Sequence, residues 1–412
     1  MIYDLIVIGG GPAGMTAAIY AASEGASVCI IEHNDRVGRK ILSTGNGKCN
    51  ITNMYIDQSC YHSSSGTDFY EVIKKCTPDD IRNFCMTMGI HTKDKNGYVY
   101  PYSEQASAVL DGFRSELKNR GVEVFTSVHI TSVGKCGDVF KAECKEGLYT
   151  GRKLILAGGS RCAPGTGSDG SCYNYASSFG HGIVKVVPAL TGLICREKYF
   201  KELHGVRAAA EITVKTDGKQ DETLREHGEL QFADYGISGI PVFQICGSIK
   251  RLLDEGKHPA VSIDLAYGIQ KERLYEIING MFSRCPWGCV SEALGGLLNK
   301  KLAVVIVKEA SVRPSAKCSE LKRADIIRIC DTIKCLKATP SDTRGFEYAQ
   351  CCAGGVSLKE IDMATMESKL VRGLYFAGEI MDVDGICGGY NLTWAIASGK
   401  LAGISSGKKY HD

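Results

Sequence analysis

The chain has 412 residues, of which 44% are hydrophobic and 23% are charged, and its formal net charge at pH 7 is +3. This length exceeds one simple core, so we expect two or three domains of an ordinary globular protein. The near balance of charge comes without a basic block interleaved with aromatic residues, so we expect no nucleic-acid partner.

The first segment, MIYDLIVIGGGPAGM, carries Asp4 and runs straight into a glycine turn, so it predicts a buried strand rather than a targeting signal. No stretch approaches about 18 uninterrupted apolar residues, and we therefore expect a cytoplasmic protein with no membrane partner. The 19 cysteines are odd in number and lack C-x-x-C spacing, so we expect free thiols and no metal site. The closest pairs are Cys285/Cys289, Cys330/Cys335 and Cys351/Cys352.

Residues 3–8 (YDLIVI) predict a strand, which Gly9-Gly10-Gly11-Pro12-Ala13-Gly14 and a helical pattern follow at once. In a dinucleotide-binding turn, Gly9 permits the tight bend, Gly11 lets the backbone approach a pyrophosphate, and Gly14 lets the helix pack closely. A second predicted strand, ASVCIIEH, carries Glu32, and an acid at this distance accepts hydrogen bonds from an adenosine ribose. The candidate cofactor-binding residues at this end are Gly9, Gly11, Pro12, Ala13, Gly14 and Glu32. This motif would serve NAD as well as FAD.

Residues 165–170 (GTGSDG) fit the same G-x-G-x-x-G string, but their context differs. The preceding strand pattern, RKLILA, ends several residues earlier, Pro164 intervenes, and no strand that ends in an acid follows at the required distance. We therefore expect no second nucleotide-binding domain.

The middle of the chain changes pattern twice. Residues 190–268 alternate polar and apolar with glycine-bearing turns, which predicts a small β-barrel or antiparallel sheet, and residues 269–335 have helical spacing. We therefore expect an α/β protein: a Rossmann-type FAD-binding fold with an inserted β-barrel-like domain and a small helical subdomain. The predicted domains are a discontinuous FAD-binding domain (1–188 and 345–412), a β-rich substrate domain (189–268 and 336–344) and a helical subdomain (269–335).

The C-terminal segment 373–403 predicts a strand (LYFA), the pair Gly378-Glu379, a glycine-rich turn and a helix that begins near Asn391. A simple NAD dehydrogenase has no need of this segment. In flavoproteins whose cofactor domain is interrupted, it brings an acid near the ribityl hydroxyls and a helix N-terminus that stabilises the negative charge of a reduced flavin. The segment predicts FAD as the cofactor, with candidate residues Gly378, Glu379, Gly388, Gly389, Asn391 and Leu392.

Five blocks, spaced over nearly the whole chain, resemble one family. They are GGGPAGM, GRKILSTGNGKCNITN (38–53), LILAGGS (154–160), GELQFADYGISGIPVFQI (228–245) and AGGVSLKEIDMATMESKLVRGLYFAGEIMDVDGICGGYNLTWA (353–395). On these blocks the chain resembles the BaiN-like family of bacterial NAD(P)/FAD-dependent oxidoreductases. That family includes bile-acid dehydroxylation reductases that act on double bonds of 3-oxo-steroids, and oxidases assigned to aminoacetone.

The resemblance implies that Arg39 and Lys40 lie near the cofactor phosphates, where the alternative is a solvated surface pair. It also implies that the backbone of Val128 contacts the adenine, where the alternative is an ordinary strand residue, and that Gly158 lies close to FAD. A segment rich in backbone donors and amides would wrap the cofactor. Its residues are Gly45, Asn46, Gly47, Lys48, Cys49 and Asn50.

For the reaction, the resemblance implies reduction of a C=C bond conjugated to a 3-oxo group in a steroid-like enone, with NAD(P)H as the transient electron donor. Such a reduction needs a proton donor near the carbonyl oxygen or the α-carbon, and Tyr235 and Tyr390 are the candidates. The alternatives are a packing role for Tyr235 and a backbone-positioning role for Tyr390. Arg344 and His204 could reach an anionic end of the substrate or be surface residues.

Two other functions stay open on the sequence. One is a flavin amine or aminoketone oxidase that passes electrons to oxygen and produces peroxide. The other is a non-catalytic flavin-binding redox module whose insertion is an interaction surface. The sequence leaves the true substrate, the choice between NADH and NADPH, and the oligomeric state open.

Overall fold

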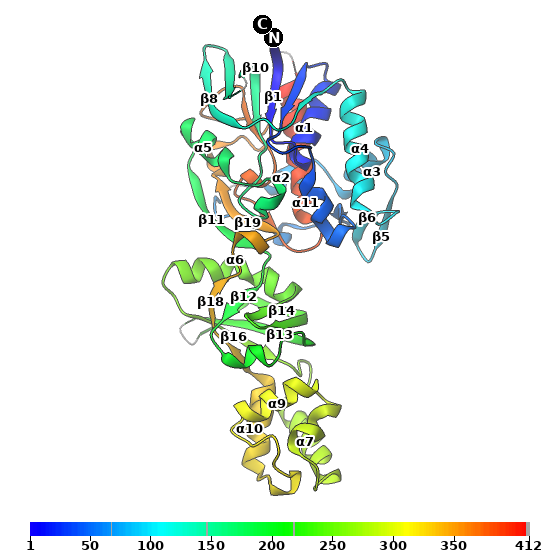
Figure 1. Cartoon of the computed structure of the whole chain (residues 1–412), viewed down its shortest axis with the longest axis vertical. Coiled ribbons are helices and arrows are strands. Elements are labelled where there is room, and N and C mark those ends of the chain that lie inside the picture. Colours follow the sequence, from blue (N-terminus) through cyan, green and yellow to red (C-terminus); the bar gives the residue numbers. More distant parts are fainter. Residues whose placement is uncertain (67, 146, 217–218, 409–412) are drawn as a thin grey trace. The chain divides into compact units, whose positions relative to one another are not determined.

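The computed structural model describes residues 1–66, 68–145, 147–216 and 219–408, with the backbone alone at 219–223. The chain forms two compact units, Met1–Val187 with Ala349–Asp412 and Pro188–Tyr348. Figure 1 shows that the N-terminal strand (blue) and the C-terminal helix (red) share the first unit. The glycine motifs of both chain ends therefore belong to one unit. No helix in the described ranges is long and apolar enough to cross a membrane.

A seven-stranded sheet forms the centre of the first unit, in the order β7-β2-β1-β10-β9-β8, with β20 also paired to β10. The pairs among β1, β2, β7, β10 and β20 are parallel, whereas β8 and β9 pair antiparallel. The strands are β1 Ile2–Ile8, β2 Val28–Ile31, β7 Glu123–Phe125, β8 Ile130–Cys136, β9 Val139–Cys144, β10 Gly147–Leu156 and β20 Leu374–Phe376. This parallel sheet with its β1-turn-α1 start confirms the predicted Rossmann-type α/β fold.

Helices and smaller sheets surround this sheet. The helices are α1 Pro12–Ser23, α2 Tyr70–Lys74, α3 Pro78–Thr87, α4 Ala106–Asn119, α5 Ser171–Ser178 and α11 Tyr390–Gly407. The smaller sheets pair β3 Thr52–Asn53 and β5 Thr92–Lys95 with β6 Tyr98–Pro101, β4 Tyr61–His62 with β21 Asp384–Gly385, and β11 Ile183–Ala189 with β19 Cys351–Val356. Pro12 stands at the first position of α1, where its fixed φ suits a helix and its missing N–H has no helical partner to lose.

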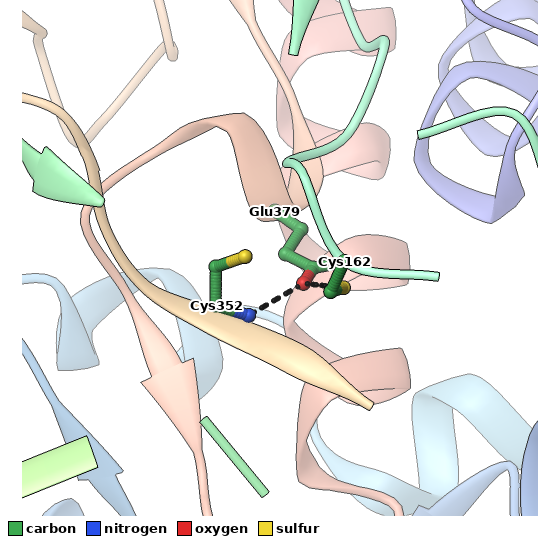
Figure 2. Close-up of side chains that lie close together, drawn as sticks. All are labelled: Cys162, Cys352 and Glu379. Atoms are coloured by element: carbon green, nitrogen blue, oxygen red, sulfur yellow. Dashed lines mark hydrogen bonds between the residues drawn. The ribbon is translucent and has the colours of Figure 1, made fainter. Parts of the chain in front are cut away.

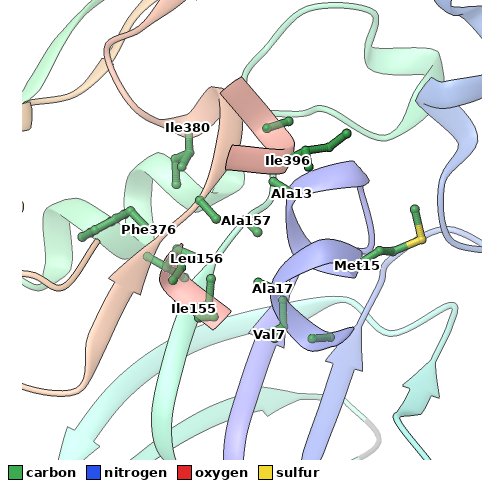
Figure 3. Close-up of a cluster of buried hydrophobic side chains, with 14 of the residues drawn as sticks. Val7, Ala13, Met15, Ala17, Ile155, Leu156, Ala157, Phe376, Ile380 and Ile396 are labelled. Atoms are coloured by element: carbon green, nitrogen blue, oxygen red, sulfur yellow. The ribbon is translucent and has the colours of Figure 1, made fainter. Parts of the chain in front are cut away.

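The helices α1 and α11, from opposite ends of the chain, pack very closely. A Cβ added at Gly399, Gly403 or Gly407 would lie 2.5, 2.4 or 2.8 Å from a backbone carbonyl oxygen of α1. Figure 3 shows the apolar cluster around this contact, in which Ala17 of α1 and Ile396 of α11 lie with Ile155 of β10. Glycine at every fourth position of α11 therefore brings the two backbones together.

The second unit holds a seven-stranded sheet in the order β17-β16-β13-β14-β15-β12-β18, and all of its described pairs are antiparallel. The strands are β12 Leu193–Cys195, β13 Arg207–Thr216, β14 Lys219–Ala233, β15 Gly236–Ser238, β16 Pro259–Asp264, β17 Leu336–Ala338 and β18 Pro340–Thr343. Of the two forms that the alternation allowed, the antiparallel sheet is the one observed. The described pairings do not join β17 to β18 into a closed barrel.

Helices occupy the remainder of the second unit. They are α6 Ile240–Asp254, α7 Lys271–Arg284, α8 Val290–Ala293, α9 Lys300–Glu309 and α10 Arg323–Lys334. One hydrophobic core contains residues of the sheet, such as Val261, together with helical residues such as Leu274 and Ile329. The helical pattern of 269–335 is thus found as helices, and a separate functional role for them stays a prediction.

Candidate functional site

The first unit contains a cavity of about 210 Å³ at the end of β1 where the glycine turn begins. Its walls come from the β1–α1 turn, the end of β2, the segments around Val128 and Gly158, helix α5, and the C-terminal Glu379 and start of α11. A parallel α/β sheet carries its ligand at the carboxyl ends of the strands, and this cavity lies at that end of β1 and β2.

The glycine turn has room for a ligand on one side only. Gly9 has φ +103°, and a Cβ there would lie 2.5 Å from the Ala157 carbonyl oxygen, while a Cβ at Gly14 would lie 1.9 Å from the Gly9 carbonyl oxygen. A Cβ at Gly11 would meet nothing within 4 Å. Gly11 is also the N-cap of α1, and its own position supplies no side-chain cap. The first N–H groups of α1 are therefore available to an anion such as a phosphate.

Glu32 is buried directly after β2 and is held by two backbone N–H groups and one side-chain amide. Its Oε2 accepts a hydrogen bond from the N–H of Gly10 at 2.8 Å, and its Oε1 accepts from the N–H and the Nδ2 of Asn34 at 2.9 and 2.8 Å. The N–H of Val128 donates to the Glu32 carbonyl oxygen at 3.1 Å, which fixes Val128 on the same wall. A carboxylate held in this way is suited to accept hydrogen bonds from a ribose.

The string at 165–170, which has the wrong context for a second nucleotide domain, forms part of the same cavity. Thr166, Gly167, Ser168 and Asp169 line it, and the Thr166 carbonyl oxygen accepts from Asn34 Nδ2 at 3.2 Å. Sequence reasoning missed this wall because its contact with Asn34 joins residues 132 positions apart.

Glu379 also lines the cavity and lies at the centre of a polar cluster. Its Oε2 is 2.5 Å from Lys40 Nζ. Its Oε1 accepts hydrogen bonds from Ser160 Oγ at 2.8 Å, the N–H of Cys352 at 2.9 Å and Cys162 Sγ at 3.0 Å. Figure 2 shows the last two of these contacts, with Cys162 and Cys352 on either side of the carboxylate. Both Lys40 and Glu379 line the cavity, with 23% and 17% of their side-chain surface exposed.

Both members of this pair are charged at neutral pH. Burial opposes ionisation of Glu379, yet Lys40 and the donors Cys162 and Ser160 hold its pKa below the ordinary value. Burial likewise disfavours the Lys40 ammonium, but Cys162 and Glu379 outweigh this and raise its pKa. A hydrogen bond with Cys352 and burial raise the pKa of Cys162, so this thiol stays a donor. The Sγ atoms of Cys162 and Cys352 and an oxygen of Glu379 lie within 4.8 Å of one another, as metal ligands could, but Lys40 already supplies a positive charge there.

The structure brings together more than half of the cofactor-binding residues expected from sequence. Those that line the cavity are Gly9, Gly11, Pro12, Ala13, Glu32, Arg39, Lys40, Val128, Gly158, Glu379, Asn391 and Leu392. Those that do not line it are Gly14, Gly45, Asn46, Gly47, Cys49, Asn50, Gly378, Gly388 and Gly389. Their direct contacts with a cofactor stay predictions.

Asn50 nevertheless has a feature that a ligand could satisfy. Its Oδ1 is buried and finds no hydrogen-bond partner among the residues that the structure describes. This oxygen would lie 3.0 Å from a Cβ added at Gly389, the N-cap of α11. An unpaired buried acceptor beside a helix N-terminus fits a group that brings its own hydrogen-bond donor.

The two candidate proton donors have different surroundings. The Tyr390 hydroxyl donates to the Tyr55 carbonyl oxygen at 2.9 Å, burial raises the pKa of Tyr390, and the residue does not line the cavity. This geometry favours the alternative role in backbone positioning. Tyr235 belongs to the second unit, where its ring lies over Arg344, whose Cζ is 4.5 Å from the ring centroid. The role of proton donor stays a prediction for both residues.

The chain matches known proteins over nearly its whole length. A family model described as the HI0933-like protein Rossmann domain matches residues 3–405. The 3-dehydro-bile acid delta(4,6)-reductase of Clostridium scindens is 39% identical over 408 residues, with 98% of each chain covered. The ribosomal RNA dihydrouridine synthase of Haemophilus influenzae is 28% identical over 406 residues, with 97% of each covered. The solved 3-ketosteroid-delta4-(5alpha)-dehydrogenase of Rhodococcus jostii RHA1, in complex with 4-androstene-3,17-dione, gives a TM-score of 0.48 at 16% identity, covering 99% of this chain and 97% of that one.

Proposed function

The chain belongs to the HI0933-like Rossmann family, and from this premise we propose that it is an FAD-dependent oxidoreductase that reduces C=C bonds conjugated to a 3-oxo group in steroid or bile-acid intermediates. The family resemblance read from the sequence blocks is confirmed by the match over residues 3–405. The single observation that carries the choice of substrate is the 39% identity, over 98% of both chains, to a reductase named for bile acids.

The cavity fits FAD on three features of the structure. The uncapped start of α1 with its open face at Gly11 suits the pyrophosphate, and the backbone-held Glu32 suits the adenosine ribose. The Glu379–Lys40 pair offers an acceptor and a donor to the hydroxyl-rich part of the cofactor. When bound, FAD would supply the two-electron chemistry, while the protein supplies orientation and proton delivery.

The residues of the chain have three tasks in this proposal. The cavity walls hold the cofactor, and the Glu379–Lys40 ion pair places one negative and one positive charge on these walls. The second unit supplies the residues that bind the substrate. Hydride addition to the β-carbon of an enone leaves negative charge on the carbonyl oxygen, so a neutral hydroxyl near that oxygen assists the reaction. We assign this task to neither candidate tyrosine, because the Tyr390 hydroxyl already donates to Tyr55 and the Tyr235 ring lies over Arg344.

The names of the two curated relatives describe one bond class. A dihydrouridine differs from a uridine by saturation of a C=C bond conjugated to a carbonyl, as a delta(4,6)-reductase saturates a double bond of a steroid ring. The general part of the proposal is therefore the reduction of a C=C bond conjugated to a carbonyl. The narrower part is that the substrate is a steroid or bile acid. NAD(P)H as transient electron donor belongs to the same proposal.

Anaerobic stopped-flow mixing tests the reaction. NADH or NADPH should bleach the flavin absorption at about 450 nm, which FAD proteins share through their cofactor. Addition of a 3-oxo-Δ4 bile acid should then restore the absorption with formation of the saturated product. Reoxidation by a uridine-containing ribosomal RNA fragment, and by no steroid enone, would contradict the substrate class.

The same preparation separates the other two functions. Peroxide release on addition of aminoacetone in air, without NADH, would indicate an aminoketone oxidase. Failure of every donor and acceptor to change the flavin spectrum would indicate a non-catalytic module. Release of FAD by heat, with one equivalent per chain, checks the cofactor independently of turnover.

A further inference from the structure

Arg344 lies between two tyrosine rings of the second unit. Its Cζ is 3.5 Å from the centroid of the Tyr348 ring and 4.5 Å from that of Tyr235. We call Arg344, Tyr235 and Tyr348 the Arg344 platform. Cation–π contacts of this kind hold a guanidinium by its faces and leave the N–H groups in its plane free.

The backbone is shaped to build this platform. The N–H of Arg344 donates to the Gly192 carbonyl oxygen at 3.0 Å. A Cβ at Gly192 would lie 2.9 Å from the Tyr235 hydroxyl oxygen, so a glycine is needed for Tyr235 to approach. Gly345 has φ +78°, a left-handed conformation that turns the chain from Arg344 toward Tyr348 and favours glycine. Arg344 and Tyr348 therefore come from one short stretch of backbone, and Tyr235 comes from the turn between β14 and β15.

The guanidinium has no acidic partner. Within the described part of the chain, the Arg344 side chain forms neither an ion pair nor a hydrogen bond, whereas Arg207 and Arg225 of the same sheet pair with Glu229 and Glu211 at 3.3 and 2.9 Å. The acid nearest in sequence, Asp342, is 3.0 Å from Lys250. A planar fork of unpaired donors, rigidly held and half-buried, matches the two oxygens of a carboxylate.

We propose that Arg344 binds the carboxylate of an acidic substrate and that Tyr235 and Tyr348 hold its guanidinium in the orientation for two-point recognition. This inference rests on the proposed function, since a bile acid carries such a group at the end remote from its 3-oxo ring.

The test compares an acid with its neutral analogue on the oxidised, FAD-loaded enzyme. Isothermal titration would give the Kd of a 3-oxo-Δ4 bile acid and of its primary amide. The wild type should bind the acid about tenfold more tightly, the effect of a charge-assisted, bidentate contact. R344Q should bring the ratio to about one with the Kd of the amide unchanged. R344K should keep part of the ratio, because an ammonium retains the charge but not the fork.

R207Q is the matched control. Arg207 is an exposed arginine of the same sheet, ion-paired with Glu229, so its loss should leave the ratio at the wild-type value. Thermal unfolding of R344Q should match the wild type, which separates a lost contact from a lost fold.

Two results would overturn the inference. They are equal binding of the acid and the amide by the wild type, and equal weakening of both in R344Q. Turnover of the neutral 4-androstene-3,17-dione reports on the proposed function separately. Reduction of this enone without an acid preference would overturn the Arg344 inference alone, whereas an acid preference without reduction of any enone would support it and overturn the reductase.

Discussion

Glu379 owes its charge to side chains and a backbone N–H group that are distant in the sequence. Lys40, Ser160, Cys162 and Cys352 come from three separate segments, and each contributes a donor or a charge to one carboxylate. An unpaired buried carboxylate would be neutral, so these neighbours keep a negative charge on the cavity wall. A hydrogen bond with Cys352 and burial raise the pKa of Cys162, so its thiol is a donor to Glu379 rather than a thiolate nucleophile.

The Glu379→Gln variant should be less stable than the wild type by about 2 kcal/mol, because Lys40 keeps its charge without a counter-ion on a wall that is only partly exposed. Urea unfolding, followed by the fluorescence of the buried Trp394 in the first unit, measures the difference. Glu309→Gln, at an exposed position of α9, is the control and should change little. An unfolding midpoint equal to that of the wild type would show that the pair contributes nothing.

The contribution of the Glu379–Lys40 ion pair should also make the stability depend on pH. The pKa of Glu379 in the folded state lies below its ordinary value of 4.5, so its contribution is present above about pH 4.5 and is lost as the pH falls through the folded pKa. The pKa of Lys40 is raised above 10.5, so its contribution is present below that value and is lost at higher pH. The free energy of unfolding, measured in urea, should therefore fall less steeply in E379Q than in the wild type as the pH is lowered from 7. An identical decrease of the free energy of unfolding in both proteins at acid pH would contradict a lowered pKa of Glu379.

At the scale of elements, the contact of α1 with α11 decides whether the two ends of the chain can form one cofactor unit. The three glycines of α11 at positions 399, 403 and 407 face carbonyl oxygens of α1. Any side chain there pushes the helices apart, and the N-termini of both helices move with them. The sequence shows these glycines, but only the structure shows that they allow α11 to pack closely against the backbone of α1.

Gly403→Ala should destabilise the first unit by about 1–3 kcal/mol, because the added Cβ would lie 2.4 Å from the Ala17 carbonyl oxygen. Gly280→Ala in α7 is the matched control: it is also a helical glycine, but its Cβ would meet nothing within 4 Å. The control should gain about 0.5–1 kcal/mol from helix propensity. Thermal unfolding of the two variants should therefore shift in opposite directions, and a gain in Gly403→Ala would refute the close contact.

At the scale of the whole molecule, the sequence predicts what is local and misses what is distant. The strand at 3–8 is found as Ile2–Ile8, and the helix expected near Asn391 begins at Tyr390, because periodicity and glycine turns act between neighbours. The wall at 166–169 and the cluster at Glu379 depend on pairs more than 100 residues apart, for which the sequence carries no spacing signal. The contact of Tyr235 with Arg344 is of the same kind, joining residues that the sequence could single out only one at a time.

The insertion between the two halves of the first unit gives the last prediction. Val187 and Ala349 flank the second unit, and β11 and β19, which continue from these points, are paired strands about 5 Å apart. A short glycine-serine linker can therefore replace residues 190–348 without stretching the first unit. This variant should keep FAD at one equivalent per chain, because every residue that lines the cavity lies outside the deletion. It should lose enone reduction, since Tyr235 and Arg344 go with the insertion; retained reduction would place the substrate surface in the first unit.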